Sequence, residues 1–384
     1  MTRTDPETGD ILVLNSGSSS LKFGLFSVAA DDEAPLLEGS ADGIGRAGGS
    51  LQMKSRDSNV DVQMSPVMES QTDALQKLAS VLDEHGYGRP VAVGHRVVHG
   101  GPNVRTHRRL TAEVKRQLQE AVHFAPLHIP PALTLIDEAS AIFGNAQHFV
   151  CFDTAFHCTL PPRAAHLPLP RRYADAGVIR YGFHGLSYES LVHRLGADLP
   201  ARTVFAHLGN GSSLCALRDG KSVDTSMGLT PTGGIPMGTR SGDLDPGVLL
   251  YLMRVEGLDA DGLETLLNRA SGLAGFAGGE SDMQALLRRS ADGDSDAALA
   301  VEVFATAVRK SIGAYAALLG GIDLLVFTGG IGEHSPEIRD RICMELDFLG
   351  LSPGHHVAKV RVMHTEEERQ IARHCRALLE SPAN

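Results

Sequence analysis

The sequence predicts an α/β protein, and three observations lead to this class. Short apolar runs of strand length alternate with helical patterns along nearly the whole chain. Three buried strands are each followed by a glycine-rich turn, near residues 15–20, 207–213 and 329–333. The length of 384 residues suggests two domains, although one large α/β domain also fits it.

The first half begins with a predicted strand, turn and strand. Residues 11–14 are apolar, residues 15–20 form a polar turn, and residues 21–28 are again typical of a strand. Apolar periodicity and glycine stops predict the remaining elements of this half. In order, these are a helix at 72–85 ended by Gly86, a strand at 91–98, helices at about 111–123 and 130–143, and a buried strand at 147–156.

The second half repeats this succession. A strand at 204–208 leads through a turn into a strand at 214–217, and Asp219-Gly220 is typical of a hairpin. Asp245-Pro246 predicts a helix N-cap followed by proline at the first helical position. The other elements are a helix at 294–319, a strand at 323–328 broken by the glycines of 329–332, a helix from Ser335-Pro336, and a last helix opened by a capping box at 365–368.

One turn occurs twice, about half a chain apart. Ser18-Ser19-Ser20-Leu21 and Gly211-Ser212-Ser213-Leu214 both lie between two strands at the start of a half. Duplication of one α/β unit would explain the similarity. Chance would explain it equally well, because Gly-Ser turns are common.

Composition excludes several classes of function. The net charge of -11 argues against a nucleic-acid or anionic-membrane partner. No apolar run approaches the roughly 18 residues that a membrane span needs, and residues 1–10 lack the apolar core of a signal peptide. The five cysteines are widely spaced without a CxxC motif, which favours a reducing, cytoplasmic compartment over a disulfide framework or zinc site.

The glycine-rich turns suggest a nucleoside triphosphate ligand, because glycine lets backbone N–H groups approach phosphate oxygens. Two standard nucleotide motifs fail. Gly220-Lys221-Ser222 lacks the earlier glycine of a P-loop, which would stand at Cys215. The GxGxxG match at residues 43–48 precedes a strand-like stretch instead of a helix, so it does not predict a dinucleotide site.

Four side chains are candidates for chemistry. Arg96 ends an apolar strand, and Arg240 lies in a glycine-flanked loop; an arginine fork binds carboxylate or phosphate, although a surface ion pair is the commoner use. Asp153 follows a buried strand, where α/β proteins place ligands, and it could instead cap a turn. His184 lies between glycine and phenylalanine, and alone it would be read as a core or cap histidine.

Taken together, these segments resemble the acetokinase (acetate kinase) family, within the superfamily of acetate and sugar kinases, heat-shock ATPases and actin. The similarity runs in the family's order from residue 11 almost to the C-terminus, and 180–185 and 236–246 are its most specific stretches. The matching segments are 15–23, 94–101, 124–128, 152–157, 180–185, 207–213, 228–246, 327–335 and 365–368.

The resemblance implies an α/β fold of two duplicated ribonuclease-H-like domains, as in the actin-like ATPase superfamily, with an active-site cleft between the domains. The last helix would return to the first domain. The expected domains are therefore residues 1–152 plus 367–384, and residues 153–366 with the nucleotide site and a homodimer interface. Expected ligands are ATP or ADP, acetate or acetyl phosphate, and Mg²⁺, with Mn²⁺ as an alternative.

The resemblance also implies a role for individual residues. Asp153, His184, Arg240 and Arg96 match the catalytic group, in which the arginines flank acetate and the transferring phosphoryl group. The apolar pocket for the acetate methyl would comprise Val98, Leu127, Phe183 and Pro231. The nucleotide would contact Lys22, His207, Leu208, Gly209, Asn210, Gly211, Asp282, Met283, Gln284, Gly330, Ile331, Gly332, Glu333 and His334. Asn15 and Glu367 match the magnesium site, although Glu367 is also a typical acid of a first helical turn.

The chemistry agrees with these residue types. An acetate carboxylate is already a nucleophile, so no general base is needed, and catalysis consists of alignment and charge neutralisation. Asp153 is accordingly interpreted as an orienter of metal or arginine. If Asp153→Asn kept normal turnover and Mg²⁺ dependence, that interpretation would be wrong.

Several positions depart from the family pattern without touching a proposed catalytic group. Gln284 and His334 leave the choice of nucleotide open, and Ile129 leaves the preferred length of the acyl chain open. The other departures are Leu186, Tyr188 and Glu366. A propionate or other short-chain carboxylate kinase is the nearest alternative, because one methylene discriminates by only about 1–3 kcal/mol. A non-catalytic nucleotide sensor is the alternative of another class, and it predicts loss of the acyl-site residues, which are present.

Overall fold

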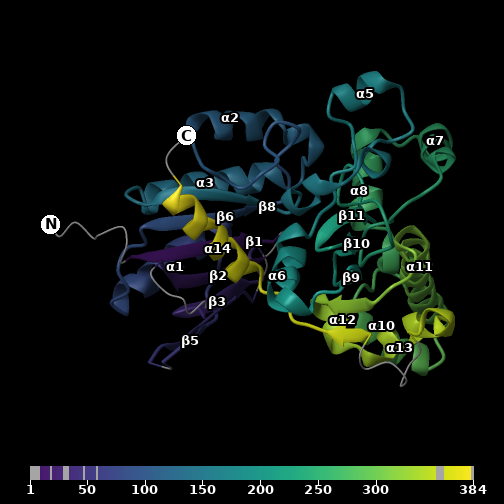
Figure 1. Ribbon diagram of the computed structural model, residues 1–384. Coiled ribbons are helices and arrows are strands. Elements are labelled where there is room, and N and C mark those ends of the chain that lie inside the picture. The colour runs from purple at the N-terminus through teal and green to yellow at the C-terminus, as the bar shows by residue number, and fades with distance from the viewer. Residues whose placement is uncertain are drawn as a thin grey trace. The chain divides into compact units, whose positions relative to one another are not determined.

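The computed structural model describes residues 9–17, 20–28, 34–45, 48–57, 59–351 and 359–381. The chain divides into two compact units, Met1–Ala155 with Glu366–Asn384, and Phe156–Thr365. The first unit is discontinuous because the last helix joins it (Figure 1). The boundary after Ala155 lies three residues beyond the expected one after residue 152, so Asp153 belongs to the first unit. The second boundary lies one residue before the expected one, so Glu366 belongs to the first unit as well.

The first unit is built on an eight-stranded sheet of order β5-β4-β3-β2-β1-β6-β8-β7. Its strands are β1 Asp10–Ser16, β2 Ser20–Ser27, β3 Leu37–Asp42, β4 Ser50–Ser55, β5 Asp61–Met64, β6 Ala92–Val97, β7 Arg108–Arg109 and β8 Gln147–Phe152. Its helices are α1 Gln71–Glu84, α2 Ala112–Glu120, η1 Val122–Phe124, α3 Ile129–Ile142 and α14 Glu367–Glu380.

Alternation along β1 gives this sheet two covered faces. Leu12 and Leu14 belong to the core that includes buried residues of α1 and α3. On the other face α14 crosses β1, β2 and β6, and Figure 1 shows it as the yellow helix over these strands. The close approach requires Gly94, because a Cβ there would lie 2.6 Å from Cys375 Sγ.

The second unit is built on a five-stranded sheet of order β11-β10-β9-β12-β13. Its strands are β9 Arg202–Leu208, β10 Ser212–Arg218, β11 Lys221–Thr225, β12 Leu324–Thr328 and β13 Val360–Val362. Its longer helices are α6 Gly185–Leu195, α7 Pro246–Val255, α8 Ala260–Arg269, α10 Met283–Ala291, α11 Ser295–Leu319 and α13 Pro336–Cys343. Shorter segments are η2 Ala155–Thr159, which begins at the division, α4 Pro162–Ala165, α5 Arg171–Asp175, η3 Gly196–Asp198, α9 Gly272–Phe276, α12 Gly329–His334 and η4 Asp347–Leu349.

Again the central strand separates two cores. Val204, Ala206 and Leu208 of β9 pack with α11, whereas Phe205 packs with Tyr188 and Leu191 of α6. These alternating apolar positions explain why β9 is buried on both faces.

The two sheets share one topology, which confirms the duplicated unit. In the first, β1, β2 and β3 form an antiparallel meander, and β6 and β8 extend it in parallel beyond β1. In the second, β9, β10 and β11 form the meander, and β12 and β13 extend it in parallel beyond β9. Both therefore have the ribonuclease-H-like order 3-2-1-4-5. The repeated turn joins the first two strands of each unit, although Ser18 and Ser19 lie outside the described residues.

Most predicted elements are present. Asp219 and Gly220 have φ of 52° and 76°, as a type I′ hairpin turn requires. Asp245 caps α7 by accepting from Gly247 N. The GxGxxG segment precedes strand β4, so rejecting it as a dinucleotide motif is confirmed, although Arg46 and Ala47 lie outside the described residues.

Three local predictions are wrong. The strand expected to reach residue 156 ends at Phe152, because the chain turns into η2. The glycines after β12 form the short helix α12 instead of an open turn, and the Glu333 carboxylate accepts from Gly329 N at 3.0 Å. No side chain caps α14, because the expected cap Thr365 contacts Ser190 Oγ at 3.3 Å.

Candidate active site

In the first unit, Arg96 and Asp153 form a buried two-pronged ion pair. Arg96 comes from the end of β6, and Asp153 follows the adjacent strand β8. Arg96 Nε donates to Asp153 Oδ1 at 2.9 Å and Nη2 donates to Oδ2 at 2.6 Å. Asp153 is 2 % exposed, so this carboxylate is held almost entirely by its protein partners.

Asn15 links this pair to the beginning of α14. Its Oδ1 accepts from Arg96 Nη1 at 3.0 Å, and its Nδ2 donates to Glu367 Oε2 at 3.1 Å and Glu368 Oε1 at 2.7 Å. Burial acts to lower the pKa of Arg96, but the charges of Asp153, Glu367 and Glu368 outweigh it and raise that pKa above its usual value. Arg96 therefore remains a cation facing three carboxylates.

This cluster fits the oxygen preference of a hard divalent cation. Asn15, Glu367 and Glu368 offer amide and carboxylate oxygens, the ligands that Mg²⁺ takes in proteins. Three carboxylates act on the Arg96 guanidinium, and a divalent cation held beside Glu367 and Glu368 would add attractive positive charge to them. Sequence reasoning selected Asn15 and Glu367 but treated Glu368 as a capping residue.

Lys22 lies directly opposite Asn15 in the β1–β2 pair, so the two side chains share one face of the sheet. Lys22 is exposed, whereas Asn15 is buried. An exposed ammonium beside this cluster is available to an anionic ligand.

In the second unit, His184 stands at the N-terminus of α6 in a left-handed conformation, with φ of 59° and ψ of 23°. That conformation is uncommon outside glycine and is found often at functional sites. Its Nδ1 lies 2.8 Å from Ser213 Oγ, and its ring stacks on His207 with centroids 4.2 Å apart. His207 is oriented in turn by Ser187, whose Oγ lies 2.9 Å from His207 Nδ1.

Two nitrogen donors converge beside the turn after β9. A Cβ built on Gly211 would lie 3.4 Å from His184 Nε2 and 3.5 Å from Arg240 Nη1. Arg240 is positioned by a 3.1 Å hydrogen bond from Nη1 to the Pro231 carbonyl. Glycine at 211 keeps this space open, and an anionic group there would meet a guanidinium and an imidazole.

The turn at 209–212 is held by its own residues. Ser212 Oγ accepts from Gly209 N at 3.0 Å and donates to the Gly209 carbonyl at 2.8 Å. Asn210 O accepts from Gly238 N at 3.1 Å, which ties the turn to the loop that carries Arg240. Leu208, the last residue of β9 before this turn, is buried in the core, so its side chain supports the turn.

The expected adenosine-side residues lie at two helix starts of the second unit. Asp282 caps α10, accepting from Ala285 N at 2.9 Å, while Met283 is buried and Gln284 exposed. In α12, Gly330 and His334 are exposed, Ile331 is half-buried and Gly332 is buried. Glu333 is engaged by Gly329 N and by His364 Nδ1 at 2.9 Å, which gives it a structural role.

The residues expected around an acetate methyl belong to both units. Val98 and Leu127 are half-buried in the first unit. Phe183 and Pro231 are buried in the second unit. Phe183 directly precedes His184, and the carbonyl of Pro231 accepts a hydrogen bond from Arg240.

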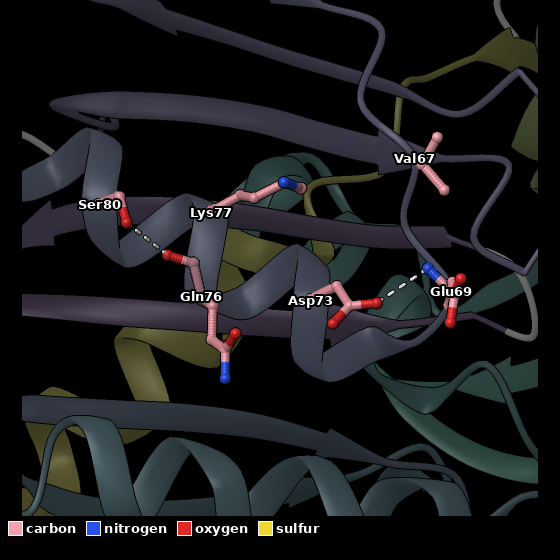
Figure 2. A pocket seen from close by; sticks show the side chains of 6 residues that line it. All are labelled: Val67, Glu69, Asp73, Gln76, Lys77 and Ser80. Atoms are coloured by element: carbon pink, nitrogen blue, oxygen red, sulfur yellow. Dashed lines mark hydrogen bonds between the residues drawn. The ribbon is translucent and has the colours of Figure 1, made fainter.

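A pocket of about 480 Å³ lies along α1 and the segment before it (Figure 2). Its lining includes Asp73, whose Oδ2 accepts from Glu69 N at 2.9 Å as part of the helix cap. The lining residues are Val67, Glu69, Asp73, Gln76, Lys77 and Ser80. None of them is a candidate site residue, so this pocket is not the candidate active site.

The sequence did not single out three residues that contact the candidate site residues, namely Glu368, Ser213 and Tyr188. Tyr188 Oη lies 2.5 Å from Ser213 Oγ. The twin serines of the turn were the available signal for Ser213, whereas Tyr188 was noted only as a departure.

The described part of the chain contains no helix that combines the length and apolarity needed to cross a membrane. The model of the acetokinase family matches residues 10–373. An acetate kinase of Clavibacter sepedonicus is 42% identical, with 94% of this chain and 97% of that protein covered. A propionate kinase of Citrobacter rodentium is 41% identical, with 97% and 98% covered.

Solved structures agree. Porphyromonas gingivalis acetate kinase superposes with a TM-score of 0.83 at 35% identity, covering 97% of this chain and 100% of that one. A propionate kinase from Francisella tularensis gives a TM-score of 0.87 at 34% identity, covering 95% and 98%.

Proposed function

The chain belongs to the acetokinase family, and on that premise we propose that it transfers the γ-phosphoryl group of ATP reversibly to acetate, giving acetyl phosphate and ADP. It is a kinase whose phosphoryl acceptor is a carboxylate. The observation that carries the assignment of the site is the convergence of His184 Nε2 and Arg240 Nη1 beside Gly211.

These donors suit the charge that develops during phosphoryl transfer. The acetate oxygen attacks phosphorus while the bond to the ADP oxygen breaks, and negative charge spreads over the equatorial oxygens. Arg240 and His184 would stabilise those oxygens. The turn at 207–211 would hold the phosphate chain, with open backbone at its glycines.

Arg96 would bind the acetate carboxylate or the transferring group with the donor capacity that Asp153 leaves free. Asp153 occupies Nε and Nη2 of Arg96, which fixes the plane of the guanidinium. Its own function is thus to orient Arg96, and no proton transfer is required of it.

Asn15, Glu367 and Glu368 would hold Mg²⁺, or Mn²⁺ in its place. When bound, the ion would neutralise phosphate charge. Lys22, opposite Asn15, would add a further contact to the nucleotide. Asp282, Met283, Gln284 and the 330–334 segment would face the adenosine, with Met283 as the apolar surface and exposed Gln284 as a polar contact.

Propionate is the second candidate acceptor, because propionate kinases match about as well as acetate kinases. Val98, Leu127, Phe183 and Pro231 would surround the alkyl group. An assay that traps acyl phosphate as hydroxamate tests both acids, with butyrate as a third and Arg240→Ala as control. Preferred acetate turnover that the variant loses supports the proposal; preferred propionate turnover changes the substrate, and no acyl phosphate from any acid refutes the kinase assignment.

A homodimer is proposed to form through α7. This helix is apolar, yet none of its residues is buried, and Leu250, Tyr251 and Val255 are 48 %, 56 % and 61 % exposed. A second copy would cover it with an identical surface. Light scattering should find a dimer that Tyr251→Glu dissociates and Leu169→Glu, at another exposed site, does not; a wild-type monomer would refute it.

A cytoplasmic location is proposed as well. None of the five cysteines, all of which are among the described residues, forms a disulfide, and four of them are buried, which is usual in a reducing compartment. Fractionation of the native host would test it, and recovery from an extracytoplasmic fraction would contradict it.

A further inference from the structure

A buried chain of side chains leads to the ring of His184 within the second unit. Tyr188 Oη on α6 lies 2.5 Å from Ser213 Oγ on β10, which lies 2.8 Å from His184 Nδ1. Tyr188 and Ser213 are both fully buried, so bulk solvent does not reach their hydroxyl groups.

The direction of the first hydrogen bond follows from the partners of Tyr188. Burial raises its pKa well above 10.0, so the phenol keeps its proton. The His207 backbone can only donate to the Tyr188 oxygen. Among the described residues, Ser213 Oγ is thus the acceptor within reach, and Tyr188 donates to it.

The direction of the second bond follows from the first. Ser213 Oγ accepts the hydrogen bond from Tyr188, and its own hydrogen needs a buried acceptor. His184 Nδ1 provides that acceptor at 2.8 Å. An Nδ1 that accepts a hydrogen bond carries no proton, so the proton of the neutral ring lies on Nε2.

We propose that Tyr188 and Ser213 are positioning residues that keep His184 neutral with its proton on Nε2, aimed at the phosphoryl group. The catalytic role of His184 in this inference rests on the proposed function, whereas the tautomer of His184 does not. Protonation of Nδ1 would require the Ser213 hydroxyl, whose hydrogen-bond partners among the described residues are Tyr188 and His184, to turn away from the His184 ring.

The cationic and titratable groups around the His184 ring also favour its neutral form. Arg240 Nη1 from the 237–243 loop and Nε2 of His184 approach the same point beside Gly211. The His207 ring of β9 stacks on His184 and is itself bonded to Ser187 of α6. A second positive charge on His184 would be repelled by Arg240.

Nitrogen-15 NMR of ring-labelled histidine tests the tautomer directly in protein without substrate. Wild-type His184 should show a protonated Nε2 and a bare Nδ1 at pH 7. Tyr188→Phe frees Ser213 Oγ to accept, so His184 should gain a proton on Nδ1 at higher pH than in the wild type. Tyr181→Phe is the matched control, because Tyr181 is a buried tyrosine of the same unit whose hydroxyl donates to the Gly177 carbonyl.

Kinetics give the second readout. Tyr188→Phe should lower kcat about tenfold, steepen its loss at acid pH and leave KM for ATP nearly unchanged. Ser213→Ala removes the hydroxyl that links Tyr188 to His184. Adding Tyr188→Phe to Ser213→Ala should therefore change kcat and its pH profile no further.

A wild-type Nδ1 proton at pH 7, or an unchanged tautomer and pH profile in Tyr188→Phe, would overturn the inference. If Tyr188→Phe fails to fold, the wild-type spectrum and Ser213→Ala decide. Absence of acyl phosphate formation by the wild type would refute the proposed function and leave the tautomer result standing.

Discussion

Arg96 donates two parallel hydrogen bonds to Asp153, from Nε to Oδ1 at 2.9 Å and from Nη2 to Oδ2 at 2.6 Å. The remaining nitrogen, Nη1, donates to Asn15, which contacts both acids at the start of α14. One arginine thereby connects three segments of the first unit that are far apart in the sequence. Catalytic positioning and local stability are expected to depend on the same pair.

Asp153→Asn should therefore damage both turnover and stability. The amide would remove the charge that Arg96 opposes and one of its acceptors, so we expect kcat to fall at least about a hundredfold. Breaking a buried pair leaves an uncompensated charge, and the free energy of unfolding should fall by about 2–4 kcal/mol. Steady-state kinetics and urea unfolding measure these effects; near-normal turnover with unchanged Mg²⁺ dependence would show that Asp153 does not orient Arg96.

Glu368→Gln should raise the Mg²⁺ concentration needed for half-maximal activity by about tenfold or more. The physical reason is the loss of one carboxylate from the Asn15–Glu367–Glu368 cluster. Mg²⁺ titration of activity checks it, with Glu380→Gln at the exposed end of the same helix as control. Equal Mg²⁺ requirements in the two variants would remove Glu368 from the metal site.

Gly94→Ala should displace α14 from the sheet. The added methyl would lie 2.6 Å from Cys375 Sγ and 2.7 Å from Ile371 Cγ2, and such overpacking costs about 1–3 kcal/mol. Because α14 carries Glu367 and Glu368, the Mg²⁺ requirement should rise too. Gly88→Ala, whose methyl would meet nothing within 4 Å, is the control; if both variants unfold at the same urea concentration, the close approach is not needed.

Acid should destabilise the protein through its buried histidines. Burial, together with the charge of His148, lowers the pKa of His95 from 6.5 to about 3, and burial lowers that of His157 to about 4. The unfolded chain then binds more protons than the folded one between these values and 6.5. Stability should accordingly fall as pH drops below about 6.5, by up to about 1.4 kcal/mol per pH unit for each histidine.

Urea unfolding between pH 7 and 5 measures that slope. His95→Gln removes one titrating group and should flatten it, and His85→Gln, at an exposed position, is the control variant. The same slope in the His95 variant and the wild type would contradict the assignment.

The sequence predicted features whose cause is local. Asp219 and Gly220 form the expected hairpin turn because both tolerate positive φ, and Asp245 caps α7 because its partner is two residues away. The shared order of the two sheets was only suspected from one repeated turn, since strand order depends on contacts that no local pattern encodes.

Long-range partners account for what the sequence did not predict. Thr365 does not cap α14 because it contacts Ser190, 175 residues away, and Glu368 contacts Asn15 at a separation of 353 residues. Tyr188 looked like a departure from a family pattern until the fold brought it to Ser213. The family resemblance supplied the residues that we propose to react, whereas their neighbours Glu368, Ser213 and Tyr188 became visible only in the structure.

Oxygen-18 tests whether an acetate oxygen becomes bonded to the transferred phosphorus. The enzyme would be given ATP, Mg²⁺ and acetate labelled on both oxygens, and the product would be cleaved with hydroxylamine, which breaks the bond between the acyl carbon and the bridging oxygen. We expect the released phosphate to carry one oxygen-18 atom, and Arg240→Ala to yield almost none. Phosphate without label, from a wild-type enzyme that consumes ATP, would contradict phosphoryl transfer to acetate.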